Sequence, residues 1–315
     1  MLKEKRHLPL LLTAAVFGLT FLLLFSVIKS KIYGQASDDI AVAEKAETPP
    51  AAPLVKKTAS VAAAPSAAFR SAALENADLK NNLTWTFGAK AQRGWYLYVP
   101  LIQQTIGTEN APETPEFAAA VAVWQQKSAI YPTGKIDNET LSAMVKWWQS
   151  RRLNSSRYPS EEQLLSAPID NFYDPTRAAE LLKVERETYR AYKKMIAAAA
   201  KDLNLKTDAN GELAPEEKFL RIVSSFRSRE YQDKLRRASP DSGRAGLAVN
   251  SPHFTGCALD IYVGGEPTIT KDYNRAAQVQ TPAYKWLVKN AERFGFYPYY
   301  YEPWHWEYVP GKVQN

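Results

Sequence analysis

Histidine is scarce in this chain, and its placement limits how the chain can fold. Of the three histidines among 315 residues, His7 flanks an apolar N-terminal run, and only His253 and His305 lie in the remainder. His253 belongs to the segment Ser-Pro-His-Phe-Thr-Gly-Cys-Ala-Leu-Asp, which ends at Asp260, and His305 ends the segment Glu-Pro-Trp-His. Two imidazoles and one carboxylate are the ligand set of a catalytic zinc site, which keeps a fourth position open. We therefore expect a fold that brings these side chains together around a divalent metal ion.

The first motif predicts a strand that carries Asp260. Gly256 permits a tight entry into the strand, and alternate side chains of a strand point to opposite faces. Gly256, Ala258 and Asp260 then share one face, where the small residues leave room for a metal ion and substrate. The same alternation directs Cys257 inward as a buried apolar side chain, and a thiolate ligand is the alternative.

The second motif predicts a bend in the chain. Pro303 is unsuited to a helix interior, so the motif is not a helical pair of metal ligands. In a regular strand Glu302 and His305, three positions apart, would lie on opposite faces. A bend at Pro303 and Trp304 is therefore needed to turn both side chains toward one site, where Glu302 would act on water as a base.

The N-terminal part is predicted to lie outside any globular core. Residues 8–28 carry no charge and match the roughly 20 apolar residues that span a bilayer as a helix. Basic residues precede the run, so we expect a cytoplasmic tip and a single transmembrane anchor at residues 1–31. A cleaved signal peptide with a site at residues 34–36 is the alternative. Residues 32–80, rich in Ala and Pro, are expected to be a flexible linker.

Residues 81–152 are predicted to form a small unit of three helices. Thr114 and Pro115 have the types preferred at the N-cap and first position of a helix, and Asp137 or Asn138 would cap the last one. The region resembles the small three-helix peptidoglycan-binding domain. The matching residues are Thr114, Val121, Trp124, Gln125, Gly134, Thr140 and Leu141. Residues 110–113 lack the family's usual glycine, and Asp137 replaces another. The resemblance implies binding to wall glycan, and a helical spacer without a ligand is the alternative.

Residues 158–315 are predicted to form an α+β domain. Helical and strand patterns alternate without the glycine-rich turn of a nucleotide-binding fold. We expect a long helix from Asp174 and Pro175 to about Asn204, and further helices at 228–237 and 282–294. Strands are expected at 219–224, 258–263 and 305–309.

The two histidine motifs resemble those of the VanY-type D-alanyl-D-alanine carboxypeptidases, zinc peptidases with the LAS or hedgehog-like fold. The family pattern is Ser-x-His-x-x-Gly-x-Ala-x-Asp, followed later by Glu-x-Trp-His. Each fixed position is present between residues 219 and 309: Ser251, His253, Gly256, Ala258, Asp260, Glu302, Trp304 and His305. The upstream segments at 225–228 and 231–232 look like the family's Arg-Ser element.

The resemblance implies that Zn²⁺ is held by His253, Asp260 and His305, with Glu302 as the general base. It also implies further substrate or transition-state contacts by Arg227, Ser251, Gln232 and Trp304. A surface arginine paired with Glu230 is the alternative for Arg227. The implied function is D-Ala-D-Ala carboxypeptidase action on peptidoglycan stem peptides, on the periplasmic or wall side of a bacterial cytoplasmic membrane. An endopeptidase of the same fold and a non-catalytic wall-binding protein are the alternatives.

Charge and cysteine content limit the partners and the cross-links that this protein can have. A net charge of +7 without a basic stripe interleaved with aromatic residues does not indicate a nucleic-acid partner. A single cysteine excludes an internal disulfide. A carboxypeptidase needs a cation for the free carboxylate of its substrate, and Arg227, Arg229 and Arg244 are the candidates in this sequence.

Overall fold

The computed structural model describes residues 68–88, 90–154, 157–238 and 250–312. All of them lie in one compact unit, Val61–Asn315. Within these ranges no helix has both the length and the apolar character needed to cross a membrane. The predicted anchor at residues 8–28, the alternative cleavage site at 34–36 and the candidate Arg244 lie outside the described residues.

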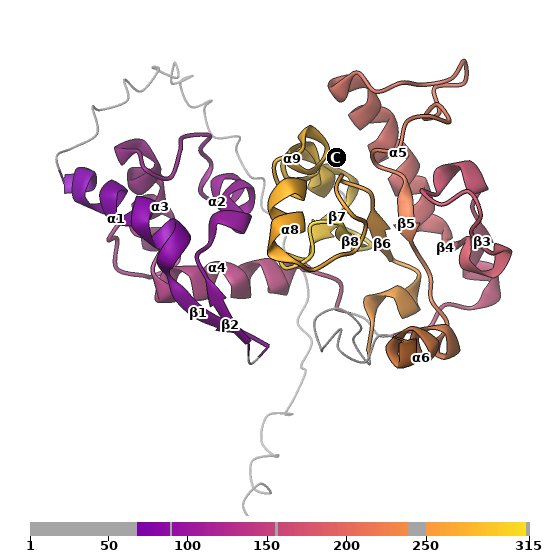
Figure 1. The fold of residues 1–315 in the computed structure, drawn as a ribbon, viewed down its shortest axis with the longest axis horizontal. Coiled ribbons are helices and arrows are strands. Elements are labelled where there is room, and N and C mark those ends of the chain that lie inside the picture. Colours follow the sequence, from indigo (N-terminus) through magenta and orange to yellow (C-terminus); the bar gives the residue numbers. More distant parts are fainter. Residues whose placement is uncertain (1–67, 89, 155–156, 239–249, 313–315) are drawn as a thin grey trace, which may run out of the picture. The chain divides into compact units, whose positions relative to one another are not determined.

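The first described region is mainly helical (Figure 1). Its elements are α1 (Ala68–Asn82), β1 (Thr84–Phe87), β2 (Lys90–Arg93), α2 (Val99–Ile106), α3 (Pro115–Lys127) and α4 (Asn138–Arg151). Strands β1 and β2 pair as an antiparallel hairpin. The Thr114 side chain accepts a hydrogen bond from the Phe117 amide, and Asp137 accepts one from the Thr140 amide. The predicted caps are therefore confirmed, with Asp137 rather than Asn138 before the last helix.

The prediction that the flexible linker extends to residue 80 is wrong for residues 68–80, because α1 occupies them. Ala72 and Ala73 are buried against Ala118 of α3, where small side chains allow close helix packing. Asn76 is fully buried and donates to the Gly134 carbonyl at 2.9 Å. The error arises because a composition rich in Ala, Lys and Glu suits a helix as well as a tether.

The second described region combines helices with an antiparallel sheet (Figure 1). Its elements are β3 (Leu164–Ser166), β4 (Lys183–Glu185), α5 (Arg186–Leu203), β5 (Ile222–Ser224), α6 (Arg229–Ala238), β6 (Ala258–Ile261), α8 (Asp272–Gln278), α9 (Pro282–Asn290), β7 (Phe296–Pro298) and β8 (His305–Tyr308). The four-stranded sheet has the order β5-β6-β8-β7, and all of its neighbouring strands are antiparallel. The predicted α+β class is confirmed for this region.

The long helix predicted from Asp174 begins instead at Arg186. The Glu185 carboxylate caps it by accepting from the Thr188 amide at 2.8 Å. Asp174 makes a local turn, where its carboxylate accepts from the Thr176 amide at 2.9 Å. Aspartate before proline suits a turn as well as a helix start, and residues 183–185 pair with 164–166 as β4 against β3. Tertiary pairing therefore decides the helix boundary.

The predicted division into separate units at 81–152 and 158–315 does not follow the hydrophobic core. Tyr300 and Tyr301, at the C-terminal end of the chain, are buried in the same apolar cluster as Trp148 and Tyr98 of the helical region. Arg275 of α8 is also buried, and it donates to the Tyr301 carbonyl at 3.2 Å. The two regions therefore share part of one core.

Candidate metal centre

His253 lies in a short 3-10 helix directly before strand β6. This helix spans Pro252–Thr255, and the Ser251 hydroxyl accepts from the His253 amide at 3.4 Å. Gly256 follows with φ +71°, and a Cβ there would lie 3.0 Å from the Cβ of Glu185. Because a side chain at residue 256 would be strained and crowded, glycine is required for the turn that connects His253 to the strand.

Asp260 and His305 meet because their strands are paired. In the antiparallel ladder of β6 and β8, Asp260 lies directly opposite His305. Residues opposite each other on neighbouring strands have side chains on the same face of the sheet. The bend predicted between Glu302 and His305 is present, since the His305 amide donates to the Glu302 carbonyl at 2.9 Å.

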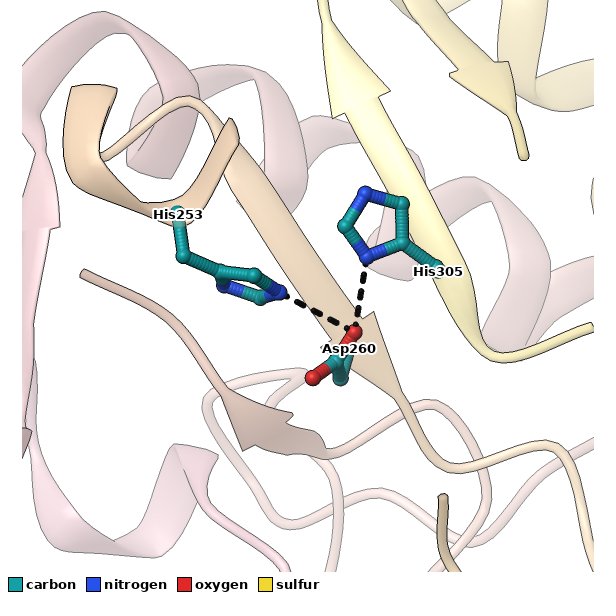
Figure 2. A group of neighbouring side chains, drawn as sticks. All are labelled: His253, Asp260 and His305. Carbon is teal, nitrogen blue, oxygen red and sulfur yellow. Dashed lines mark hydrogen bonds and ion pairs between the residues drawn. The ribbon is translucent and has the colours of Figure 1, made fainter. Parts of the chain in front are cut away.

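The three predicted ligands form one buried cluster (Figure 2). His253 Nε2 lies 3.3 Å and His305 Nδ1 lies 3.0 Å from the same oxygen of Asp260, Oδ1. Their ligand atoms all lie within 4.8 Å of one another. Bonds of about 2 Å to a tetrahedral metal ion separate neighbouring ligand atoms by about 3.3 Å. The two distances from the histidine nitrogens to Asp260 are therefore close to those of a tetrahedral metal site.

Hydrogen bonds on the far side of each ring fix the histidine tautomers. His253 Nδ1 lies 2.7 Å from the Ser225 carbonyl oxygen, which only accepts, so Nδ1 carries a hydrogen. His305 Nε2 likewise faces the carboxylate of Glu307 at 3.1 Å. In the neutral form of each ring, the lone pairs of His253 Nε2 and His305 Nδ1 then both point toward Asp260. A buried set of three facing acceptors is unfavourable unless a cation or proton lies among them.

Burial and nearby charges shift the pKa values of all three predicted ligands. Burial and, to a smaller extent, the nearby charge of Arg227 lower the pKa of His253 to about 4. Burial also opposes a charge on His305, but hydrogen bonds to Asp260 and Glu307 raise the pKa of His305 to about 9. Burial opposes the charge of Asp260 as well, yet His253 and Arg227 hold the pKa of Asp260 well below its usual range. Asp260 is therefore an anion at neutral pH, as a metal ligand must be.

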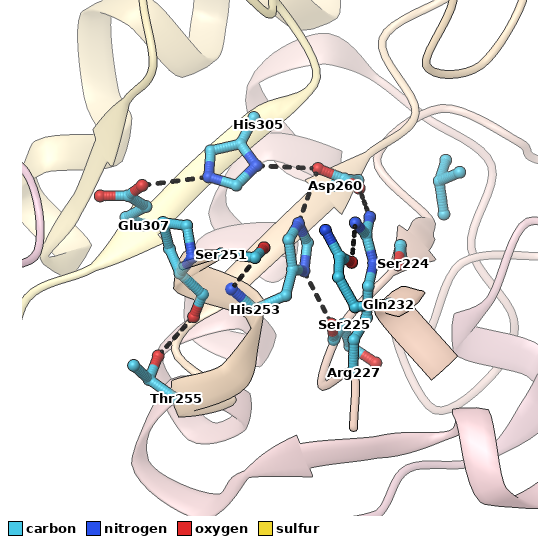
Figure 3. A network of polar contacts seen from close by, with 12 residues as sticks. Ser224, Ser225, Arg227, Gln232, Ser251, His253, Thr255, Asp260, His305 and Glu307 are labelled. Carbon is cyan, nitrogen blue, oxygen red and sulfur yellow. Dashed lines mark hydrogen bonds and ion pairs between the residues drawn. The ribbon is translucent and has the colours of Figure 1, made fainter. Parts of the chain in front are cut away.

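Arg227 fixes the second oxygen of the Asp260 carboxylate (Figure 3). Its Nη2 donates to Asp260 Oδ2 at 2.6 Å, its Nε to Ser224 Oγ at 2.9 Å and its Nη1 to Gln232 Oε1 at 3.3 Å. Arg227 is only 8% exposed, so the alternative of a surface arginine paired with Glu230 is wrong. The buried arginine therefore orients the carboxylate and leaves Asp260 Oδ1 for a ligand role.

Glu302 is buried beside this cluster. It is 7% exposed, and its Oε1 has no hydrogen-bond partner among the residues that the structure describes. Burial, with a smaller effect from Asp260, raises the pKa of Glu302 to about 8 although His305 and Arg227 oppose the rise. A buried carboxyl group whose pKa lies near neutrality has the property required of a general base or acid.

The other predicted substrate contacts also have partners within the protein. Ser251 caps the 3-10 helix that carries His253, and Gln232 accepts from Arg227. Trp304 is 3% exposed and packs in the main hydrophobic core, while its carbonyl accepts from the Ile261 amide at 2.8 Å. Trp304 therefore packs in the core, and its predicted contact with substrate stays a prediction.

Sequence reasoning missed two residues of the cluster's surroundings, Glu307 and Arg152. Glu307 contacts His305, and Arg152 pairs with Glu307. A signal for Glu307 is its position two residues after His305, which places both side chains on one face of β8. No sequence signal connects Arg152 to this site, because the contact forms only in the tertiary structure.

Part of this chain matches a known protein family. Residues 181–311 match the VanY family, described as D-alanyl-D-alanine carboxypeptidase, so this segment is a VanY-type peptidase domain. The match confirms the resemblance expected from the motifs, and it supports carboxypeptidase action on peptidoglycan.

Among the solved structures that are similar to part of this chain is that of the LdcB LD-carboxypeptidase, described as revealing the molecular basis of peptidoglycan recognition. Its identity is 24%, the match covers 49% of this chain and 71% of that chain, and the TM-score is 0.35. No curated protein matches the chain.

Proposed function

We propose that the VanY-type domain is a zinc-dependent carboxypeptidase that removes the terminal residue from D-Ala-D-Ala stem peptides of peptidoglycan. The observation that carries the proposal is the convergence of His253, Asp260 and His305 beside the buried Glu302. A structural role alone would not require a buried carboxyl group with an oxygen that no described residue satisfies. Endopeptidase action by the same site is the second candidate.

In this proposal each side chain has a defined task. His253 Nε2, Asp260 Oδ1 and His305 Nδ1 would hold Zn²⁺, which when bound supplies a Lewis acid and lowers the pKa of water to about 7. Glu302 accepts the proton of the attacking water and passes it to the leaving amine. The raised pKa of Glu302 means that this carboxyl group holds a proton more readily than an exposed one, as a proton carrier between water and the leaving amine must.

We propose that Arg227 chiefly positions Asp260, whereas the family resemblance implied a contact with the substrate or the transition state. All three of its guanidinium nitrogens have protein acceptors, and the closest acceptor is Asp260. Its first task is therefore to hold the Asp260 carboxylate. Its positive charge still lies beside the reacting centre, where charge of this sign stabilises an oxyanion.

The cation that would bind the free carboxylate of a substrate has a further candidate, Arg177. It is half-buried, and burial and the nearby charge of Arg227 lower its pKa while Tyr231 and Asp260 oppose that effect. Of the candidates named from the sequence, Arg229 stacks on the ring of Phe254 at 5.0 Å. Arg177 Nε and Nη1 donate to the Leu181 and Val223 carbonyls at 3.1 and 2.8 Å, which holds this cation close enough to Asp260 and Arg227 to sense their charges.

Purified muropeptides test the proposed reaction. The zinc-loaded chain should release single alanine residues from pentapeptide stems, which mass spectrometry detects. Glu302→Gln should lower the rate about 10²–10⁴-fold. Glu266→Gln is the matched control, because Glu266 is exposed and contacts Tyr273 instead. If wild type and both variants leave every muropeptide intact, the peptidase proposal is wrong.

The carboxypeptidase and the endopeptidase differ in their need for a free carboxylate. A pentapeptide stem and the same stem amidated at its C-terminus separate the two. A carboxypeptidase should lose most of its activity on the amide, while an endopeptidase should cleave both and also cut cross-linked dimers. Arg177→Ala should raise KM for the free acid more than for the amide if Arg177 binds the carboxylate.

We also propose that residues 8–28 anchor the chain in the cytoplasmic membrane with the peptidase domain outside the cytoplasm. The uncharged run and the basic residues before it support this arrangement. The helical region would bind peptidoglycan glycan close to the substrate. Membrane fractionation of the full chain tests the anchor, and sedimentation of residues 61–315 with purified sacculi tests the wall contact.

A further inference from the structure

The far side of the His305 ring is held by a buried acid. His305 and Glu307 lie two positions apart on β8, so their side chains share one face. Glu307 Oε1 lies 3.1 Å from His305 Nε2, and Glu307 is fully buried. Because Nδ1 of the same ring faces Asp260, the contact with Glu307 sets both the tautomer and the orientation of this candidate ligand.

The partners of this acid come from the end of the helical region. Arg152 follows the last residue of α4, and its Nη2 donates to Glu307 Oε1. The adjacent Leu153 amide donates to Glu307 Oε2 at 3.0 Å. Both oxygens of Glu307 are therefore satisfied by a segment that lies before residues 181–311, the part that matches the VanY family.

Arg152 is itself fixed in place. Its guanidinium lies over the ring of Tyr299 at 4.1 Å, and its Nη1 donates to Gln149 Oε1 at 2.6 Å. The Tyr299 ring in turn meets the His305 ring edge-on, with centroids 5.9 Å apart. Tyr299 thus lies between the Arg152 guanidinium and the His305 ring.

We propose that Arg152 is a positioning residue for the candidate metal centre. It neutralises and orients Glu307, which in turn fixes His305 Nδ1 toward Asp260. The helical region is then part of the metal site as well as a neighbour of it. This inference rests on the proposed role of His305 as a metal ligand. The other histidine differs, because His253 is oriented by the backbone carbonyl of Ser225 within the peptidase domain.

The physical reason for a measurable effect is the burial of Glu307. Arg152 and the Leu153 amide hold the two oxygens of the Glu307 carboxylate, so Glu307 should shift its position when Arg152 is removed. Such a shift releases the His305 ring. Loss of the residue that orients a metal-binding histidine typically weakens metal affinity or activity about 10–100-fold.

The full chain offers a closely matched set of variants. Arg152→Ala removes the cation, and Arg152→Lys retains a charge at the same place. Arg151→Ala is the control, because this neighbouring arginine pairs with Glu292 and stacks on Trp147 rather than contacting Glu307. Zinc affinity is measured by competition with a chromogenic chelator. The absorption spectrum of the cobalt-loaded protein reports ligand geometry, and circular dichroism confirms folding.

We expect Arg152→Ala to bind zinc about 10–100-fold more weakly and to alter the cobalt spectrum. Arg152→Lys should recover most of the affinity, and Arg151→Ala should stay within about twofold of wild type. Wild-type affinity and spectrum in Arg152→Ala would overturn the inference, and so would an equal loss in Arg151→Ala. Because the readout is metal binding, the result supports or overturns this inference whether or not the chain cleaves muropeptides.

Discussion

The helical region and the metal centre both bury polar side chains, but they satisfy them differently. In the helical region Gln125 is fully buried, and its amide nitrogen lies within hydrogen-bond distance of Thr133, the Lys135 carbonyl and Thr140. Its oxygen accepts from the Gly134 amide at 2.8 Å. The Gln125 side chain thus closes the loop between α3 and α4 with neutral groups alone.

Asn76 completes the same network from α1. Its amide donates to the Gly134 carbonyl at 2.9 Å, and its oxygen accepts from the Ile136 amide at 2.9 Å. The side-chain amides of Asn76 and Gln125 therefore have partners for both oxygen and nitrogen. A neutral network in which every member has a partner stabilises one conformation and has no unsatisfied group to offer a ligand.

The metal centre has the opposite character. Its members are charged or titratable, two imidazole nitrogens face one carboxylate oxygen, and Glu302 retains an oxygen without a described partner. Such an arrangement is costly in the folded protein and is expected where strain or desolvation serves chemistry. The contrast between the two sites separates polar burial that stabilises the fold from polar burial that prepares a reaction.

The largest expected effect tests whether the buried Glu302 serves the reaction rather than the stability of the fold. Glu302→Gln should reduce muropeptide hydrolysis about 10²–10⁴-fold, because the amide cannot accept the water proton. The free energy of unfolding should stay the same or rise, since the variant no longer buries an ionisable group. Urea denaturation of the metal-free protein measures this stability. A decrease of more than about 1 kcal/mol would assign Glu302 a structural role.

The site was more predictable from sequence than the fold around it. The two short motifs and their resemblance to a known family name His253, Asp260 and His305 together, although the meeting of Asp260 and His305 depends on the pairing of β6 with β8. The start of α5 at Arg186 and the helix over 68–80 were not predictable, since both depend on packing against distant segments. Arg152 was missed for the same reason, because its partner Glu307 lies in another region of the chain.

The neutral network predicts a loss of stability without a loss of metal affinity. Gln125→Ala leaves the buried Gly134 amide and Thr140 hydroxyl without a partner, so we expect the free energy of unfolding to fall by about 2–4 kcal/mol. Gln126→Ala is the matched control, because Gln126 is exposed on the same helix. Denaturant unfolding and zinc competition are measured on both variants. A tenfold loss of zinc affinity in Gln125→Ala alone would show that the two networks are coupled.

The smallest expected effect concerns Cys257, a polar side chain that is buried in the apolar core next to the strand that carries Asp260. Its thiol borders strand β6 but packs in the apolar core, and burial raises the pKa of Cys257 despite hydrogen bonds that oppose the rise. Because a raised pKa leaves less thiolate at any given pH, native Cys257 should react with iodoacetamide at least about tenfold more slowly than in the unfolded chain. Cys257→Ala should lower the free energy of unfolding by about 1 kcal/mol and keep zinc affinity within about twofold. If Cys257→Ala lowers zinc affinity, Cys257 belongs to the metal centre. If zinc affinity is unchanged, Cys257 faces the core while Asp260 faces the metal site, as the alternation of side chains along the strand predicts.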